Sequence, residues 1–155
     1  MKKNEDEKFL VVVECAIEYQ EKFLIIERPA SVVHAGGLLA FPGGKVEKND
    51  GQSEANILLE AVKREVFEEV GLALLDPLQI VTSSYFFIDT HQTPVIDVIF
   101  YCLLKKTNPS ITASAREVSH FAWMSLQEIL AHEKSPIWLK RYISALLPLR
   151  EQAGS

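Results

Sequence analysis

Apolar runs bounded by turn residues mark several β-strands along the chain. Valine, isoleucine, phenylalanine and tyrosine dominate these runs, and such side chains favour a pleated, half-buried surface. The predicted strands cover residues 9–19, 22–27, 38–41, 80–88, 95–104 and 118–123. The first two flank Gln20-Glu21 and predict a hairpin, and residues 89–94 predict a turn between the fourth and fifth strands.

A second pattern, with apolar positions three or four residues apart, predicts helices. The first helix runs to about Val70 and begins where Ser53 or a neighbour can cap it, after the loop-forming residues 49–53. Two more helices are predicted over residues 126–133 and 136–147. Strands and helices at separate positions indicate an α+β protein, with a twisted sheet covered on both faces.

The first helix carries an unusual row of carboxylates. At about 100° per residue, Glu65, Glu68 and Glu69 fall within one arc, beside an apolar arc that begins at Leu59 and ends at Val70. Adjacent carboxylates about 4 Å apart repel by roughly 1 kcal/mol in water, and by more when they are partly desolvated. A divalent cation reverses the sign of that interaction, and all-oxygen ligands suit Mg²⁺ or Mn²⁺.

The same residues also fit an ordinary solvent-exposed helix face with an Arg64–Glu68 pair. The surroundings favour a binding site, because residues 41–47 place two glycines at a tight turn and Gly71 stops the helix. The Gly-Gly-Lys sequence is not a phosphate-binding loop of the Walker type. That motif needs Gly where Leu39 stands and Ser or Thr where Val46 stands.

The glycine turn and the carboxylate helix together resemble the signature of the Nudix (MutT-like) hydrolase family. Gly44 opens that signature, and residues 64–72, Arg-Glu-Val-Phe-Glu-Glu-Val-Gly-Leu, match every fixed position of its second half. Between the two halves the chain has about six extra residues. The first family glutamate corresponds to Asp50 when counted forward and to Asn56 when counted backward, so neither is assigned a role. Residues 49–53 are expected to form an exposed loop extension.

The resemblance implies an α/β/α sandwich around a mixed twisted β-sheet, with a site for Mg²⁺ or for Mn²⁺ as a substitute. The implied metal ligands are the carbonyl of Gly43 and the carboxylates of Glu65, Glu68 and Glu69. Arg64 would orient these carboxylates by charge-assisted hydrogen bonds. Glu47 is either an outer ligand or an exposed loop residue.

The reaction implied is attack of water on a phosphorus of a diphosphate linkage, in a nucleoside triphosphate or a nucleoside diphosphate derivative. The catalytic set is Arg64 with Glu65 and Glu68, and either glutamate is a candidate general base. Three later carboxylates are alternative bases or ordinary turn and strand-edge residues: Asp89, Asp97 and Glu117.

Candidates for substrate contact lie upstream of the glycine turn and in a later strand. Arg28 and His34 are candidates for phosphate contact, and either is equally consistent with an exposed position. Tyr85, like its neighbours Phe86 and Phe87, is a candidate for stacking on a base, although aromatic strand residues belong more often to the core.

The residues before the glycine turn partly resemble the coenzyme A diphosphatase subgroup of the family. Pro29 stands where that subgroup has Ser or Ala, and Val33 stands where it has Arg. A nucleotide is therefore expected to be a better substrate than coenzyme A. A coenzyme A-type diphosphatase and a Nudix-fold binding or regulatory module without turnover are the alternatives.

Length and composition fit one compact enzyme. At 155 residues and 48% hydrophobic, the chain predicts a single Nudix domain over residues 1–155, with flexible tails at about 1–7 and 150–155. The net charge of −5 argues against a nucleic acid polymer or an anionic membrane as partner. Cys15 and Cys102 lack Cys-x-x-Cys spacing and predict reduced, buried thiols. We expect a cytoplasmic monomer or homodimer that acts on a small phosphoanhydride.

Overall fold

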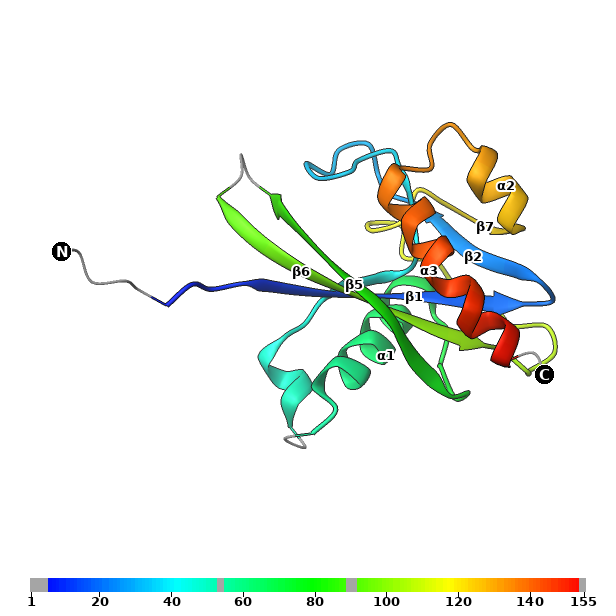
Figure 1. The fold of residues 1–155 in the computed structure, drawn as a ribbon, viewed down its shortest axis with the longest axis horizontal. Helices are drawn as coiled ribbons and strands as arrows, with labels where there is room; N and C mark the ends of the chain where they lie inside the picture. Colours follow the sequence, from blue (N-terminus) through cyan, green and yellow to red (C-terminus); the bar gives the residue numbers. More distant parts are fainter. Residues whose placement is uncertain (1–5, 53–54, 89–91, 154–155) are drawn as a thin grey trace.

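A computed structural model describes residues 6–52, 55–88 and 92–153. Its strands are β1 (Leu10–Tyr19), β2 (Lys22–Glu27), β3 (Leu39–Ala40), β4 (Gly43–Lys45), β5 (Leu78–Ile88), β6 (Thr93–Leu103) and β7 (His120–Met124). They form a seven-stranded mixed sheet with the order β3-β2-β1-β6-β5, in which β4 also pairs with β1 and β7 with β2 (Figure 1). The predicted glycine turn is therefore wrong in conformation, because Gly43 and Gly44 form strand β4, directly beside the central strand β1.

The register of the central strands decides which side chains share a face. β1 and β6 run parallel, with Val13 opposite Val98, whereas β5 and β6 form a long antiparallel hairpin. Because side chains alternate along a strand, Val13 and Val98 point to one face of the sheet, and Glu14 and Asp97 point to the other.

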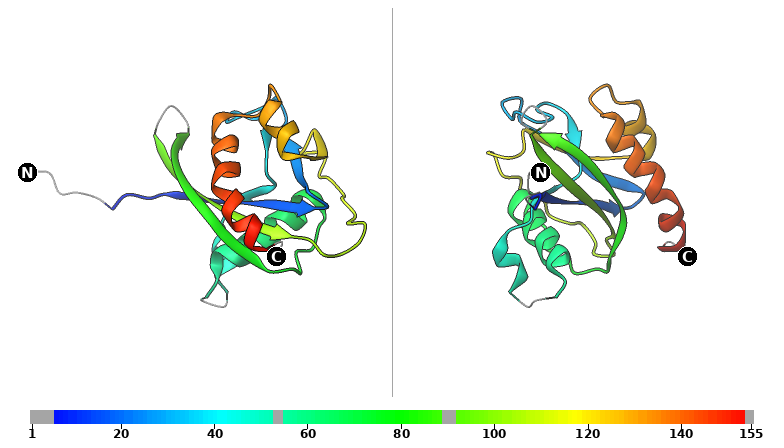
Figure 2. Two further views of the ribbon diagram at one scale, coloured as in Figure 1. Left: turned by 45° about the vertical axis from the view of Figure 1, so that its right-hand side comes forward. Right: turned by 60° about the vertical axis from the view of Figure 1, so that its left-hand side comes forward.

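Helices cover both faces of the sheet. The helix α1 (Ile57–Val70) lies on one face, and α2 (Leu126–Ala131) and α3 (Ile137–Ala153) lie on the other (Figure 2). Val62 and Val66 of α1 pack in one core cluster with β1 and β6, and Leu139 and Ile143 of α3 pack in a second. This three-layer arrangement confirms the α+β sandwich predicted from the sequence.

The last helix extends further than predicted. Residues 150–153 belong to α3, residues 1–5 and 154–155 lie outside the described residues, and the flexible tails stay a prediction. Arg150 Nε donates to both oxygens of Glu18, at 2.9 and 3.0 Å. Glu18 also accepts from the Tyr101 hydroxyl at 2.7 Å. These charge-assisted bonds to a buried carboxylate tie the end of α3 to β1.

The connection between β4 and α1 also differs from the prediction. It contains a short 3₁₀ helix, η1 (Lys48–Gly51), in which Asp50 is only 7% exposed. Residues 49–52 are therefore not simply an exposed extension. Ser53, the expected cap of α1, lies outside the described residues, and the residue that precedes the helix is Asn56, with a φ of 58°.

The two cysteines are free and buried, as predicted. Burial raises the pKa of both thiols, that of Cys102 to about 12, so both behave as small apolar core residues. Within the part of the chain that is described, no helix has the length and apolar character needed to cross a membrane.

Candidate active site

The carboxylate face of α1 lies against the glycine turn. Glu65 and Glu69 are 9% and 6% exposed, whereas the side chain of Glu68 is 52% exposed. The Gly43 N–H donates to Glu69 Oε1 at 3.0 Å. The carboxylate of Glu65 occupies the space that a Cβ on Gly44 would need. A Cβ at position 44 would therefore displace the Glu65 carboxylate.

Burial raises the pKa of both inner carboxylates. The pKa of Glu69 is raised to about 8, first by burial and further by the charges of Glu117 and Glu65, while the Gly43 N–H opposes the rise. Burial also raises the pKa of Glu65, against the opposing effect of Arg64. The charge of Glu117, in the loop before β7, raises the pKa of both groups. When Glu65, Glu69 and Glu117 are ionised, their negative charges are not fully compensated by nearby positive charge.

Arg64 binds the carboxylate that the sequence left without a role. Its Nε and Nη2 donate to the two oxygens of Asp50 at 2.7 and 3.0 Å. Its Nη1 donates to Glu65 Oε1 and to Glu68 Oε2, both at 3.0 Å, and Nη2 also donates to the Lys45 carbonyl at 2.9 Å. The guanidinium thus spans η1, β4 and α1, and it lowers the pKa of Asp50. This geometry suits the orienting role that the resemblance implied for Arg64.

Sequence reasoning missed Asp50. Counting forward from Gly44 places Asp50 at the first glutamate position, and in the structure Asp50 contacts Arg64. The forward count was therefore the correct signal, and Asn56 only precedes the helix. Glu47 lies in the same corner, 3.8 Å from Arg64 Nη1 with its side chain 60% exposed, and its role as an outer ligand stays a prediction.

The oxygen donors at this corner fit a divalent cation by their chemistry. In residues 6–52, 55–88 and 92–153 no three His, Cys, Asp or Glu side chains already converge as a formed metal site. Glu65 and Glu68 instead turn toward Arg64, and Glu69 turns toward the Gly43 N–H. The raised pKa values of Glu65 and Glu69 show that added positive charge would be favourable here. Mg²⁺ and Mn²⁺ accept such carboxylate ligands.

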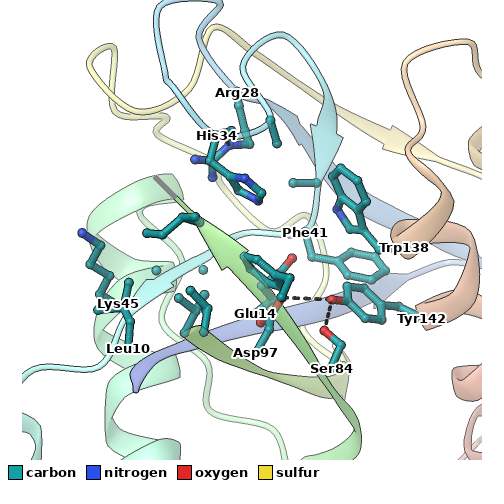
Figure 3. Close-up of a pocket in the computed structure, with 18 of the residues that line it drawn as sticks. Leu10, Glu14, Arg28, His34, Phe41, Lys45, Ser84, Asp97, Trp138 and Tyr142 are labelled. Carbon is teal, nitrogen blue, oxygen red and sulfur yellow. Dashed lines mark hydrogen bonds between the residues drawn. The ribbon is translucent and has the colours of Figure 1, made fainter. Parts of the chain in front are cut away.

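A pocket of about 750 Å³ opens between the glycine turn and α3 (Figure 3). Arg28 and His34, two of the predicted substrate residues, line it. The Arg28 Nε donates to the His34 carbonyl at 3.2 Å, and burial followed by the charge of Arg28 lowers the pKa of His34. The neutral His34 ring stacks on Phe86, with centroids 5.0 Å apart, and on Trp138, with centroids 6.2 Å apart.

Tyr85 is less well placed for substrate than its neighbour. It borders the pocket and is 56% exposed, but its ring contacts Phe9 and Phe87, at centroid distances of 6.0 and 5.2 Å. Side chains alternate along β5, so Phe86 points into the pocket when Tyr85 points away. The stacking residue that the sequence sought on this strand is therefore better represented by Phe86, and a substrate role for Tyr85 stays a prediction.

Two carboxylates, Glu14 of β1 and Asp97 of β6, form the floor of the pocket. Burial raises the pKa of both, and the charge of Asp97 raises that of Glu14 further. Asp97, considered above as a general base, points away from the α1 face, and Asp89 lies outside the described residues. The sequence signal for Glu14 was only a charged residue within an apolar strand.

A model of the NUDIX domain matches residues 8–146. The chain belongs to the Nudix family. The predicted class, a Nudix hydrolase, is thereby confirmed, and members of this family hydrolyse diphosphate linkages with divalent metal ions. No curated protein sequence matches the chain.

Solved Nudix structures share the fold. The MutT protein of Methanosarcina mazei Go1 is 23% identical, covers 95% of this chain and 99% of its own, and has a TM-score of 0.75. The NUDIX domain of Shewanella oneidensis NrtR, solved with ADP ribose, is 18% identical, with 92% and 90% covered and a TM-score of 0.69. A bifunctional NMN adenylyltransferase/ADP ribose pyrophosphatase of Francisella tularensis, solved with AMP and a Mn ion, is 18% identical, with 94% and 43% covered and a TM-score of 0.68.

Proposed function

We propose that this Nudix protein hydrolyses a diphosphate linkage in a nucleoside triphosphate or a nucleoside diphosphate derivative, in a reaction that depends on Mg²⁺ and accepts Mn²⁺. The observation that carries the proposal is the pair of buried carboxylates, Glu65 and Glu69, packed on Gly43 and Gly44. Burying two like charges costs stability unless a cation joins them, so a purely structural role explains the pair poorly.

The residues of this corner divide the work. Glu65, Glu68, Glu69 and the Gly43 carbonyl would hold the cation. When bound, the cation neutralises charge on the phosphate oxygens and lowers the pKa of a coordinated water. Arg64 keeps the carboxylates in position from behind, because its donors are already directed at Asp50 and at the helix. Asp50 acts through Arg64 and is a positioning residue.

Glu65 is our choice for the general base. Its raised pKa brings it closer to neutral pH, which favours proton transfer from water. Its Oε1 is held by Arg64 at 3.0 Å, so the carboxylate has a fixed orientation. Glu68 is more exposed, and Glu117 lies on a separate loop, although its charge reaches the same cluster. Both stay in the test as alternative bases.

Arg28 would bind a phosphate group of the substrate. Its charge lowers the pKa of both Glu14 and Glu69, and all three residues line the same pocket. Val33, at the position where the coenzyme A signature carries Arg, is 92% exposed and apolar. A nucleotide is therefore favoured over coenzyme A as substrate.

A phosphate-release screen with nucleoside triphosphates, nucleotide sugars, dinucleoside polyphosphates and coenzyme A tests the proposal. We expect turnover with Mg²⁺ or Mn²⁺ for at least one nucleotide, loss of turnover in chelator, and poorer kcat/KM for coenzyme A. Glu65→Gln, Glu68→Gln and Glu117→Gln, assayed on the best substrate, identify the base. Preference for coenzyme A over all nucleotides contradicts the substrate class, and binding without turnover supports a regulatory module instead.

The remaining expectations belong to the same proposal. We infer one Nudix unit over residues 1–155 that acts in the cytoplasm, as a monomer or homodimer, on a small phosphoanhydride rather than on a nucleic acid polymer. The net charge of −5 supports the last point, because a phosphate backbone would be repelled. The buried free thiols of Cys15 and Cys102 support a reducing compartment.

A further inference from the structure

The pocket floor holds a pair of acidic side chains that the hydrolytic reaction does not use. Glu14 and Asp97 come from adjacent parallel strands, and their side chains point to the same face of the sheet. Figure 3 shows both reaching the same space as Tyr142, below His34. Burying two carboxylates together is unfavourable in an apolar core.

The hydrogen bonds around Asp97 leave one oxygen for a ligand. The Tyr142 hydroxyl donates to Asp97 Oδ2 at 3.0 Å. Since that hydroxyl has one proton, Ser84, 2.6 Å away, donates to Tyr142. Asp97 is 2% exposed, yet among the described residues its Oδ1 accepts no hydrogen bond from an established donor. Such a buried acceptor is rare unless a proton or a ligand satisfies it.

The walls above this pair suit a flat ring. His34 and Phe86 stack with an interplanar angle of 6°, and His34 and Trp138 with an angle of 19°. The same pocket continues to the glycine turn, because Glu14 on β1 is the register partner of Gly43 on β4. A ligand with an aromatic ring over the acidic floor therefore reaches the cation corner with its phosphates.

We infer that Glu14 and Asp97 select nucleobases that carry an exocyclic amino group, namely cytosine, adenine and guanine, over uracil, thymine and hypoxanthine. The inference rests on the proposed nucleotide hydrolysis and names its specificity. An amino N–H donates to a carboxylate, whereas a keto oxygen in the same place brings two acceptors together. A site built around a hydrogen bond rejects an analogue that cannot form it.

Ribose hydroxyls are the other donors that a carboxylate pair can bind. The location of the pair argues for the base, because aromatic side chains from a loop, a strand and a helix line the same pocket: His34, Phe86 and Trp138. A ribose has no flat face to stack on these rings, whereas a base has two.

Matched nucleotides test this inference without turnover. CMP and UMP differ at one position by an amino or a keto group, and AMP and IMP differ in the same way. We expect calorimetry with Mg²⁺ to show CMP and AMP binding about 10-fold or more tighter than UMP and IMP, the equivalent of one hydrogen bond to a charged group. Asp97→Asn and Glu14→Gln should bring both ratios to within about threefold, since an amide can also donate to a keto oxygen.

Glu18→Gln is the matched control. Glu18 is also a buried carboxylate on β1 that accepts from a tyrosine, but it lies outside the pocket lining. Its substitution should leave the CMP-to-UMP ratio unchanged even where it lowers the melting temperature. Thermal unfolding of all three variants shows whether each is folded.

Several results would overturn the inference. They are equal affinities within both pairs, no binding of any of the four nucleotides at millimolar concentration, and unchanged ratios in both folded variants. If the variants instead abolish a preference for CMP over dCMP, the pair binds ribose. Selective CMP binding by a protein that hydrolyses nothing would contradict the proposed function alone, and non-selective hydrolysis would contradict the inference alone.

Discussion

The carboxylates of Glu65 and Glu69 come from one helix, whereas those of Glu14 and Asp97, on the other face of the sheet, come from two parallel strands. The helical pair faces the backbone of two glycines and the guanidinium of Arg64. The strand pair faces aromatic rings and neutral hydroxyls. Glu69 and the strand pair thus line one pocket, and the two acidic pairs have different surroundings.

The surroundings decide what each cluster can do. Carboxylates held by a guanidinium and by a backbone N–H keep oxygens directed at a cation and its phosphates. The strand pair is held by a neutral hydroxyl, that of Tyr142, and lies among aromatic rings. Such carboxylates can accept hydrogen bonds from donors on a flat ligand. We therefore expect substitutions in the helical pair to change kcat, and substitutions in the strand pair to change the preference between nucleobases.

Glu65→Gln and Glu69→Gln should have the largest effects. Each removes a negative charge from the cation corner but keeps side-chain size, so kcat should fall about 10²- to 10⁴-fold. The binding preference for CMP over UMP should persist in both variants. Glu60→Gln, at an exposed position of the same helix, is the control and should keep wild-type turnover. Wild-type kcat in both variants would place the chemistry elsewhere.

Asp50→Asn should show how much the Asp50–Arg64 ion pair stabilises the fold. Asp50 is buried and its bond to Arg64 is 2.7 Å, so we expect the free energy of unfolding at pH 7 to fall by about 2 to 4 kcal/mol, between the values for exposed and buried pairs. The folded pKa of Asp50 is lowered, so this contribution is present above about pH 4 and is lost as pH falls through the folded pKa.

Chemical denaturation over a pH series measures that difference. Asp76→Asn is the matched control, because the Asp76 carboxylate accepts the Lys105 N–H at 3.2 Å on the surface. Its substitution should cost about 1 kcal/mol or less. An Asp50 variant as stable as wild type would mean that the Arg64 bonds are replaced without cost, and that Asp50 does not position the helix.

Glu69→Gln should also show how much the buried, ionised Glu69 carboxylate destabilises the metal-free fold. The folded pKa of Glu69 is raised from 4.5 to about 8, so its ionisation destabilises the metal-free fold increasingly as pH rises between these values. In chelator, Glu69→Gln should be more stable than wild type by about 2 to 4 kcal/mol above pH 8, and no more stable below pH 4.5. Mg²⁺ should reduce this difference in the free energy of unfolding. A pH-independent difference would contradict the raised pKa.

Gly44→Ala should have a smaller effect on rate. The new Cβ would meet the Glu65 carboxylate and displace it, and a displacement of this kind lowers kcat by about 10- to 100-fold. Gly51→Ala is the control, because its Cβ would meet only the flexible Ile57 side chain, at 3.2 Å. Kinetics with saturating Mg²⁺ measure both. Equal rates for the two variants would show that Glu65 has room to move without loss.

The packing of Glu65 and Glu69 beside Gly43 and Gly44 could be predicted because these residues are local in sequence. Helical periodicity alone places Glu65 and Glu69 on one side of α1, and the glycine turn lies close before it. Asp50 was missed because residues inserted ahead of α1 broke the spacing on which the comparison relied. The backward count from Arg64 reached Asn56, whereas the forward count from Gly44 reached Asp50, the residue that contacts Arg64.

The pocket floor could not be predicted because only the sheet brings it together. Glu14 and Asp97 are 83 residues apart, and parallel pairing of β1 and β6 makes them neighbours. Tyr142 reaches Asp97 only because α3 packs on that face. The direction of side chains along β5, which favours Phe86 over Tyr85, likewise depends on register that a one-residue shift would reverse.

Turnover under metal titration tests the central claim, that the Glu65 and Glu69 corner holds a divalent cation for hydrolysis of a diphosphate linkage. The best nucleotide from the screen should be hydrolysed with Mg²⁺, stop within the mixing time of excess chelator, and resume on adding Mn²⁺. In ¹⁸O-labelled water, the label should appear in a phosphate product. Turnover that survives exhaustive chelation, or label absent from phosphate, would contradict the claim.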